Sequence, residues 1–331
     1  MFKKLVFQLS LILVLLCFGA TIFSFAATPI TLVWSAGGVG GGWYTVAAGI
    51  AELVKETYPE INIKVVPGES QLNPIKVEKN DAQLGLGLFP FDVMAVKGIG
   101  IYNTPVTKVR GIGGSVSNVY VHFLAYADYE ANSMGEIVEK KLPVRIVTQP
   151  AGSSEEFILR KTLEAYGATY DDIKSWGGNI FFIGEGEGAD LFKDKHADVL
   201  IANMAPPAAI IEEISMGGRS VKLLSISKEV IAKLASEGFI GGERAIIKKE
   251  FYNFLKEDLS TLVTGTEIMV GASVPEEVVY KITKVLCENP ERLIQIHVSL
   301  KDWIPQEGWK YLFFPLHPGA EKYYREAGYL K

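Results

Sequence analysis

The stretch from Ser35 to Tyr44, with the sequence SAGGVGGGWY, has the residue types and spacing of an anion-binding loop. It follows an apolar run, Ile30 to Trp34, and precedes a helical pattern, Thr45 to Tyr58. A strand, a glycine loop and a helix in this order direct backbone N–H groups and the positive end of a helix dipole toward a ligand. The glycines let a ligand approach the backbone, and Trp43 and Tyr44 add flat apolar surface. The alternative is a flexible surface loop.

Two nucleotide-binding motifs do not fit this loop. A phosphate-binding P-loop ends in Gly-Lys-Ser/Thr, whereas Gly42 is followed by Trp43 and Tyr44. A dinucleotide fingerprint needs a third glycine where Trp43 stands. The loop therefore predicts an anion site of another kind.

The same arrangement occurs a second time. Val144 to Thr148 resembles a strand, Pro150 to Ser154 a loop, and Glu155 to Tyr166 a helix. We expect two lobes that face one ligand, with a ligand carboxylate at Gly152, Ser153 and Ser154. The alternative for either serine is a purely structural role as the helix N-cap.

Further candidates for ligand binding follow other predicted strands, where ligands of open α/β sheets are found. For each candidate the alternative is ordinary loop chemistry, and for Phe89 it is a place in the core. The predicted ligand-binding residues are Gly40, Gly41, Trp43, Tyr44, Ser70, Asn73, Phe89, Asp92, Gly152, Ser153, Ser154, Asn203 and Pro206.

The sequence offers no constellation for catalysis and no motif for a metal or a cofactor. It contains no G-x-S-x-G, H-E-x-x-H or C-x-x-C pattern, and its four histidines are far apart. The segment Gly184 to Gly188 lacks the alternating ligands of a calcium loop and is typical of an acidic turn before a helix that begins near Ala189. We therefore expect a binding protein that is not an enzyme.

The N-terminus has the pattern of a secretory signal peptide. Lys3 and Lys4 precede an uncharged apolar run, Leu5 to Phe25, and the pattern predicts cleavage after Ala26. An uncleaved membrane anchor is the alternative. Cleavage would change the formal net charge from −5 to −7, which gives no electrostatic footprint for nucleic acid. Cys287 is then the only cysteine, so no internal disulfide is expected in a periplasmic or other extracytoplasmic protein.

Strand and helix patterns alternate along the rest of the chain, which predicts α/β lobes with parallel or mixed sheets. Leu259 to Val270 has the pattern of one long strand, and Ser273 to Glu276 that of a capping box before a helix. The strand of residues 83–88 is expected to end in a loop at Phe89 to Asp92. Tyr120 to Tyr126 and Leu262 to Val270 are the expected crossings between the lobes.

Three segments resemble the TAXI class of extracytoplasmic solute receptors, which serve tripartite ATP-independent periplasmic (TRAP) transporters. They are the glycine loop Gly37 to Tyr44, the loop Pro150 to Glu155, and the C-terminal segment Pro315 to Glu326, PLHPGAEKYYRE. The last is the most specific, and the resemblance covers nearly the whole chain after the leader. Asn80 and Lys195 depart from it, since they stand where the family tends to have glycine. The segments Phe89 to Phe91 and Met204 to Pro207 depart from it inside the expected site.

The resemblance implies a two-lobed periplasmic-binding-protein fold with a hinge, of type II character, that closes on a small ligand. The residue patterns place residues 1–26 in the signal peptide, residues 27–122 and 266–331 in lobe 1, and residues 123–265 in lobe 2. The implied ligand is a glutamate-like amino acid or another small organic acid, and the implied partners are the TRAP transporter membrane subunits. A two-lobed enzyme and a surface-anchored interaction protein of the same fold are the alternatives.

Overall fold

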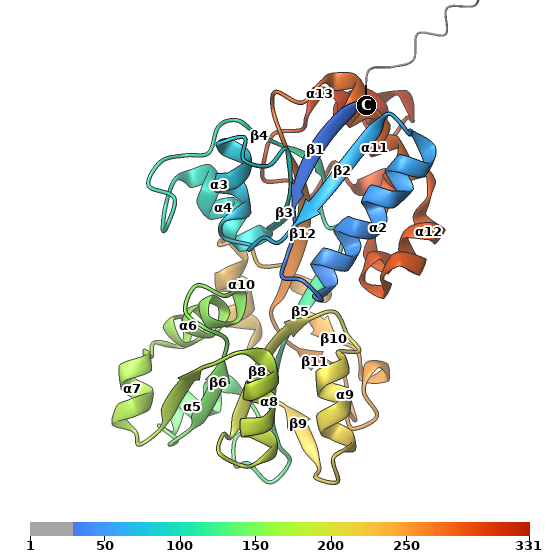
Figure 1. Ribbon diagram of the computed structural model, residues 1–331. Coiled ribbons are helices and arrows are strands. Elements are labelled where there is room, and N and C mark those ends of the chain that lie inside the picture. The colour runs from blue at the N-terminus through green and yellow to red at the C-terminus, as the bar shows by residue number, and fades with distance from the viewer. Residues whose placement is uncertain (1–28) are drawn as a thin grey trace, which may run out of the picture.

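The computed structural model describes residues 29–331, and these residues form two α/β lobes, one above the other in Figure 1. The expected signal peptide lies outside the described residues. The upper lobe contains both the N-terminal and the C-terminal part of the described chain, and the lower lobe contains the middle. The fold is therefore the expected mixed α/β architecture with two lobes.

The upper lobe, lobe 1, is built on one half of a large twisted sheet. Its strands are β1 (Ile30–Ser35), β2 (Ile61–Val66), β3 (Leu84–Leu88), β4 (Val109–Gly113) and β12 (Val263–Gly271). β1 pairs in parallel with β2 and β3, while β12 runs antiparallel to β3 and β4. The helices of this lobe are α2 (Gly42–Thr57), α3 (Asn73–Glu78), α4 (Phe89–Lys97), α11 (Glu276–Glu288), α12 (Pro290–Ile296) and α13 (Pro318–Glu326), with short 3₁₀ turns at Val298–Asp302 and Pro305–Glu307.

The lower lobe, lobe 2, contains the other half of the sheet. Its strands are β5 (Asn118–Tyr126), β6 (Arg145–Thr148), β7 (Asn179–Phe182), β8 (Val199–Met204) and β9 (Val221–Leu223), with a separate ribbon of β10 (Ile246–Ile247) and β11 (Leu259–Ser260). The helices are α5 (Met134–Glu139), α6 (Ser154–Tyr166), α7 (Tyr170–Ser175), α8 (Glu185–Lys193), α9 (Ala209–Met216) and α10 (Lys228–Ala235), with 3₁₀ turns at Gly242–Arg244 and Lys249–Phe251.

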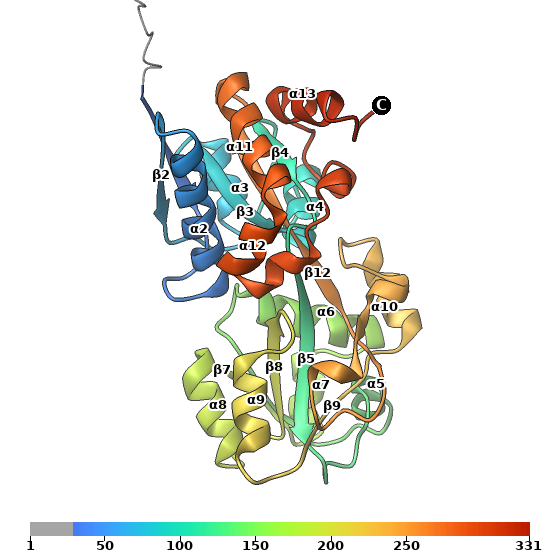
Figure 2. The same ribbon diagram turned by 90° about the vertical axis from the view of Figure 1, so that its right-hand side faces the viewer.

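Two strands connect the lobes. β5 and β12 pass from one lobe to the other and pair with each other through Val263 to Gly265 and Asn118 to Tyr120 (Figures 1 and 2). These strands overlap the two segments in which the crossings are expected, although β5 begins two residues earlier and β12 ends one residue later. Within residues 29–331 only this strand pairing continues the sheet from one lobe into the other, which gives the structure a position for a hinge.

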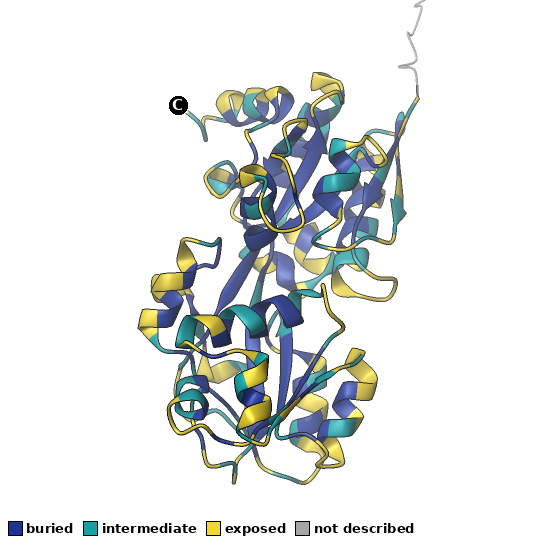
Figure 3. Ribbon diagram, turned by 90° about the vertical axis from the view of Figure 1, so that its left-hand side faces the viewer, coloured by how far each residue is buried: buried dark blue, intermediate teal, exposed yellow. Residues whose placement is uncertain are grey.

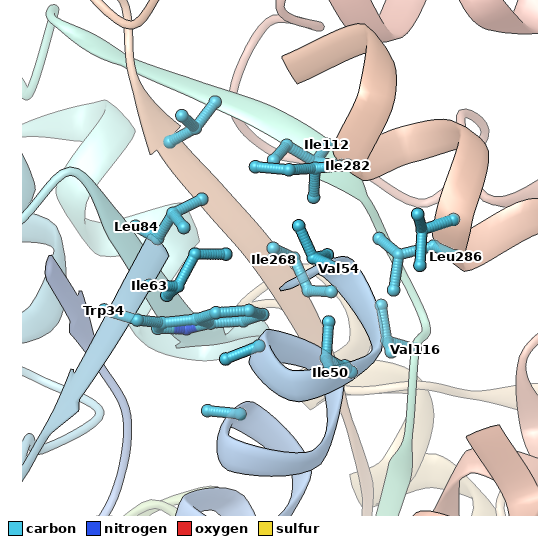
Figure 4. Packing of buried hydrophobic residues seen from close by; sticks show 14 of the residues in the cluster. Trp34, Ile50, Val54, Ile63, Leu84, Ile112, Val116, Ile268, Ile282 and Leu286 are labelled. Carbon is cyan, nitrogen blue, oxygen red and sulfur yellow. The ribbon is translucent and has the colours of Figure 1, made fainter. Parts of the chain in front are cut away.

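Each lobe has its own core, as Figure 3 shows by the dark buried faces of the strands and helices. In lobe 1, Trp34 on β1 is fully buried and packs among Ile50, Val54 and Ile268 (Figure 4). The aromatic C-terminal segment packs on this core through Trp303. Cys287 is buried in the same cluster, and burial raises the pKa of its thiol to about 12.

Several local expectations prove wrong. Phe89 to Asp92 does not form a loop but the first turn of α4, because the fixed φ of Pro90 suits the start of a helix. The long strand of residues 259–270 is divided into β11 and β12. Pro275 takes the N-cap position of α11 with no side-chain cap, so the capping box is absent. Helix α8 begins at Glu185 rather than near Ala189.

Asn80 and Lys195, which depart from the family pattern, both lie just after helices. Asn80 and Lys195 have φ angles of 62° and 63°, in the left-handed region that favours glycine. Both follow helices, α3 and α8, and both act as turn residues.

Candidate functional site

The lobes meet where the carboxyl ends of their strands face each other (Figure 1). Lobe 1 contributes the loops after β1 and β2, and lobe 2 contributes the loops after β6 and β8. The side-chain amide of Gln71, in the loop after β2, donates a hydrogen bond to the carbonyl of Gly152, in the loop after β6. The loop between β2 and α3 in lobe 1 and the loop between β6 and α6 in lobe 2 therefore face the same cleft.

The glycine loop of lobe 1 supplies free backbone donors. Residues 38–42 are exposed, and Gly40 has a φ of 83° that only glycine adopts easily. Helix α2 begins at Gly42 with Gly41 as its N-cap, no side-chain cap and no acidic residue in its first turn. The first N–H groups of α2 therefore need an acceptor from outside the helix.

Two aromatic residues border these donors. Trp43 and Tyr44 are half-buried, and Trp43 packs against the core of lobe 1 and against a second cluster that contains residues of both lobes. Trp43 therefore lies beside the boundary between the lobes, next to the glycine loop.

His297, which the sequence analysis did not select, lies beside this loop. A methyl group placed on Gly42 would be 3.2 Å from Nε2 of His297. Nδ1 of the ring accepts the backbone N–H of Ser299 at 3.2 Å. Nε2 of the neutral ring therefore carries the hydrogen and faces the start of α2 as a donor. Burial lowers the pKa of this imidazole.

Asn73 is fully buried and holds the ends of two strands together. Its Oδ1 accepts from Ser35 Oγ at 2.7 Å, and its Nδ2 donates to the carbonyls of Ala36 and Leu86 at 2.8 and 2.7 Å. These bonds join the residue that follows β1 to the middle of β3 and so fix the start of the glycine loop. Ser70, three residues earlier, is half-buried in the loop that also carries Gln71.

Phe89 and Asp92 lie inside the protein rather than on the cleft surface. Phe89 is 4% exposed and packs edge-to-face on Phe313 with ring centroids 5.0 Å apart. Asp92 is fully buried, and neither carboxyl oxygen has a hydrogen-bond partner among residues 29–331. Burial, with the nearby Glu267, raises the pKa of Asp92 well above its usual range.

The serine loop of lobe 2 is committed to its own helix. Ser153 is the N-cap of α6 and accepts the N–H of Glu156 at 3.2 Å. Ser154 donates to the carboxylate of Glu155 at 2.8 Å. Gly152 has a φ of 91°, and its N–H lies 3.5 Å from a carboxyl oxygen of Glu156. Two acids thus occupy the first turn of the helix at which a ligand carboxylate is expected.

The end of β8 lies against one of these acids. Glu155 is 6% exposed, and burial raises its pKa, an effect that the nearby backbone N–H of Asn203 partly offsets. Buried oxygens of Asn203 and of Thr148, at the end of β6, have no hydrogen-bond partner among the described residues. Pro206 is buried next to these and forms a cis peptide bond with Pro207. A buried carboxyl group and a buried amide oxygen without a partner therefore lie at the ends of β6 and β8, whereas the glycine loop carries exposed backbone donors.

Two cavities open between the lobes, on different sides of β5. One of about 430 Å³ lies between α4 and α6 and includes Gln71 and Gly152 in its lining. The other, also of about 430 Å³, is lined by Tyr120, Arg244 and Lys301, among others. Figure 1 shows α4 and α6 to the left of β5, and β10 and α12 to its right. The first cavity is continuous with the predicted cleft because it includes both residues of the hydrogen bond between the lobes.

The structure brings together part of the predicted site. Gly40 and Gly41 are exposed beside the half-buried Trp43 and Tyr44, and Gly152 accepts a hydrogen bond from Gln71 of this lobe. Gln71, Glu155 and His297 are further polar groups at the cleft that sequence reasoning missed. Only Gln71 had a signal, namely its place in the same loop as Ser70. Among residues 29–331 no helix is long and apolar enough to cross a membrane.

Comparisons with known proteins agree with this architecture. The model of the NMT1-like family matches residues 34–328. MatC from Rhodopseudomonas palustris, solved with bound malate, superposes with a TM-score of 0.54 at 14% identity and covers 91% of this chain and 98% of its own. A TctC solute-binding protein from Polaromonas superposes with a TM-score of 0.51 at 16% identity, and the match covers 92% of this chain and 98% of that protein. The periplasmic aliphatic sulphonate-binding protein SsuA from Escherichia coli superposes with a TM-score of 0.50 at 13% identity, and the match covers 90% of this chain and 84% of that protein. At these identities the likeness establishes the two-lobed periplasmic-binding-protein fold.

Proposed function

The chain belongs to the NMT1-like family, and on that premise we propose that it is an extracytoplasmic solute receptor that captures a small carboxylate between its lobes. It would deliver this solute to the membrane subunits of a TRAP transporter and would not transform it. The periplasmic location follows from the predicted signal peptide, which is part of the proposal. The ligand is a glutamate-like amino acid or another organic acid.

The observation that carries this proposal is the uncapped start of α2 at the interface of the lobes. Its first turn offers N–H donors with no side-chain cap, and Trp43 beside it packs on the core of lobe 1 and on a cluster shared by the two lobes. An anion bound there would satisfy the donors and would be shielded from water when the lobes close. A ligand that binds the closed form better shifts the population toward it, which would signal occupancy to the transporter.

We place the ligand carboxylate at the glycine loop rather than at Ser153 and Ser154. At α6 the acids Glu155 and Glu156 already occupy the first turn, and a third carboxylate would meet like charge. At α2 the first turn carries no acid, and Nε2 of His297 adds a donor. The electrostatics of the two helix starts therefore favour α2 as the anion site.

The buried acceptor groups of lobe 2 support an amino acid over a plain organic acid. Glu155 is buried beside Asn203, and a protonated amine is a group that such a carboxylate and amide oxygen would bind. A ligand with a carboxylate and an ammonium would then span the cleft. Each charged end would contact a different lobe.

The test is a screen of the purified chain, without its leader, against 2-amino acids, 2-oxo acids and dicarboxylates. A true ligand raises the melting temperature by mass action, and calorimetry then gives its affinity. Small-angle scattering with saturating ligand should show a smaller radius of gyration. Turnover of a bound compound would favour the enzyme alternative, and the absence of any stabilising solute would favour the interaction protein.

The transporter partnership needs a separate experiment. The membrane subunits would be purified and reconstituted in proteoliposomes. Uptake of the identified solute would then be measured with and without this receptor. Uptake that depends on the receptor and on an ion gradient supports the proposal. Uptake that requires ATP would contradict it.

A further inference from the structure

The cavity between α4 and α6 has one apolar wall and one charged wall. Lobe 1 contributes Phe91 and Met94 from α4 and Ile99 and Ile101 from the loop that follows. Lobe 2 contributes Phe157, Arg160 and other residues of α6. Ile99 and Ile101 are 50% and 44% exposed, which leaves large apolar side chains in contact with water in this structure.

The charged wall has no unpaired charged side chain for a second charged group of the ligand. Arg160 pairs with Glu156 at 3.2 Å, and Lys161 pairs with Glu237 at 2.8 Å. All four residues line the cavity. Two cations and two acids are therefore already matched, so a second ligand carboxylate, such as that of glutamate, would have to break an existing pair.

The cavity is larger than the space that the carboxylate and ammonium groups of a small amino acid would fill. Its volume of about 430 Å³ lies in the range of roughly 300–1,000 Å³ that is typical of sites for larger ligands. Gln71 and Gly152 connect it to the cleft in which the carboxylate is placed. A ligand anchored at the glycine loop has this cavity as the adjacent space for a side chain.

We propose that this cavity is a specificity recess for an extended apolar arm, so that the solute is a carboxylate or 2-amino acid with an unbranched aliphatic chain. This inference rests on the proposed function and narrows its ligand class away from glutamate. Phe91 and Met94 give the recess an apolar floor, and the methionine side chain adapts to arms of different shape. Ile99 and Ile101 become covered when the arm is bound.

The experiment is a chain-length series measured by calorimetry on the whole chain without its leader. One series runs from alanine through norvaline and norleucine to 2-aminooctanoate, and a parallel series runs from acetate to octanoate. Affinity should rise about three- to fourfold for each added methylene until the recess is filled, since burial of each CH₂ contributes that much. The rise is expected in at least one of the two series.

Two variants locate the effect. Ile101→Asp places a charge on the apolar wall and should remove the gain with chain length. Ile304→Asp alters an isoleucine of similar exposure, 51%, that lines the cavity on the other side of β5, and it should leave the gain intact. A gain that survives in Ile101→Asp overturns the placement of the arm.

The outcomes separate this inference from the function beneath it. If short members of a series bind and affinity does not change with length, the recess is overturned while the receptor function stands. If glutamate binds more tightly than norleucine, the recess is likewise overturned. If no carboxylate or amino acid binds at all, the proposed function fails and the recess fails with it.

Discussion

The ring of Phe91 in α4 lies 4.8 Å from the ring of Phe157 in α6, at an interplanar angle of 54°. The first belongs to lobe 1 and the second to lobe 2, and both are almost fully buried in one cluster. The lobes are thus in direct apolar contact on the side of the α4–α6 cavity. This contact and the Gln71–Gly152 hydrogen bond hold the lobes at the angle seen in Figure 1.

We expect the aromatic pair to contribute coupling energy beyond the burial of each ring. A double-mutant cycle with Phe91→Leu and Phe157→Leu should give a coupling free energy of about 0.5–1.5 kcal/mol in urea unfolding. Each single change keeps most of the apolar volume, so both variants should fold. Strictly additive effects would show that the rings pack independently.

The hydroxyl of Ser153 is expected to matter for stability and not for affinity. Ser153→Ala removes the N-cap of α6 and should lower the free energy of unfolding by about 1 kcal/mol. Ligand affinity, measured by calorimetry, should not change because the carboxylate lies at α2. Ser154→Ala is the control, since Ser154 is not the cap. A loss of affinity of tenfold or more in either variant would return the carboxylate to this loop.

Trp43 should report ligand binding through its fluorescence. It packs beside the boundary between the lobes, where closure is expected to change its surroundings, whereas Trp34 and Trp303 are buried in lobe 1. We expect a shift of emission on titration with ligand that disappears in Trp43→Phe. An unchanged shift in that variant would assign the signal to another tryptophan and weaken the case for a cleft at the glycine loop.

His297 should strengthen carboxylate binding as a donor beside α2. A hydrogen bond to a charged group contributes about 1.5–3 kcal/mol, so His297→Ala should weaken binding about ten- to a hundredfold. His196→Ala is the matched control, since His196 is exposed and follows α8 in lobe 2. Equal affinities for both variants and the wild type would mean that His297 only shapes the loop.

The sequence predicts those parts of the site that depend on neighbours in the chain. The glycine loop before α2 and the Pro150–Ser154 loop before α6 are local signals, and both lie where strand, loop and helix succeed each other. Gln71, Glu155 and His297 reach the cleft only because distant segments fold beside it. His297 approaches Gly42 across more than 250 residues of chain, and no local pattern encodes such a contact.

The start of α4 could not be predicted from the sequence for a different reason. From the sequence, Pro90 indicates the end of a strand and the beginning of a loop, but proline is equally suited to the first turn of a helix. The apolar sequence FPFDVMAVK has no clear helical face because several of its sides are buried. Asp92 therefore had the appearance of a cleft residue although it lies in the core of lobe 1.

The buried pair of Asp92 and Glu267 predicts a pH-dependent stability. Burial raises the pKa of Glu267 to about 8, and burial together with Glu267 raises that of Asp92. A carboxyl group with a raised folded-state pKa binds more protons in the native state than in the unfolded state. Its contribution is therefore most favourable below the unfolded-state pKa near 4.5 and is lost as pH rises toward 8.

Thermal unfolding from pH 4.5 to 8 tests this directly. The free energy of unfolding should fall by an amount on the order of a few kcal/mol over this range, and Glu267→Gln should reduce the slope because the amide does not titrate. The amide oxygen of that variant can still accept from the backbone N–H of Phe313, which Glu267 bonds at 2.9 Å. Glu250→Gln, at an exposed glutamate, should leave the slope as in the wild type. Parallel curves for the wild type and Glu267→Gln would mean that the buried pair does not take up protons in this range.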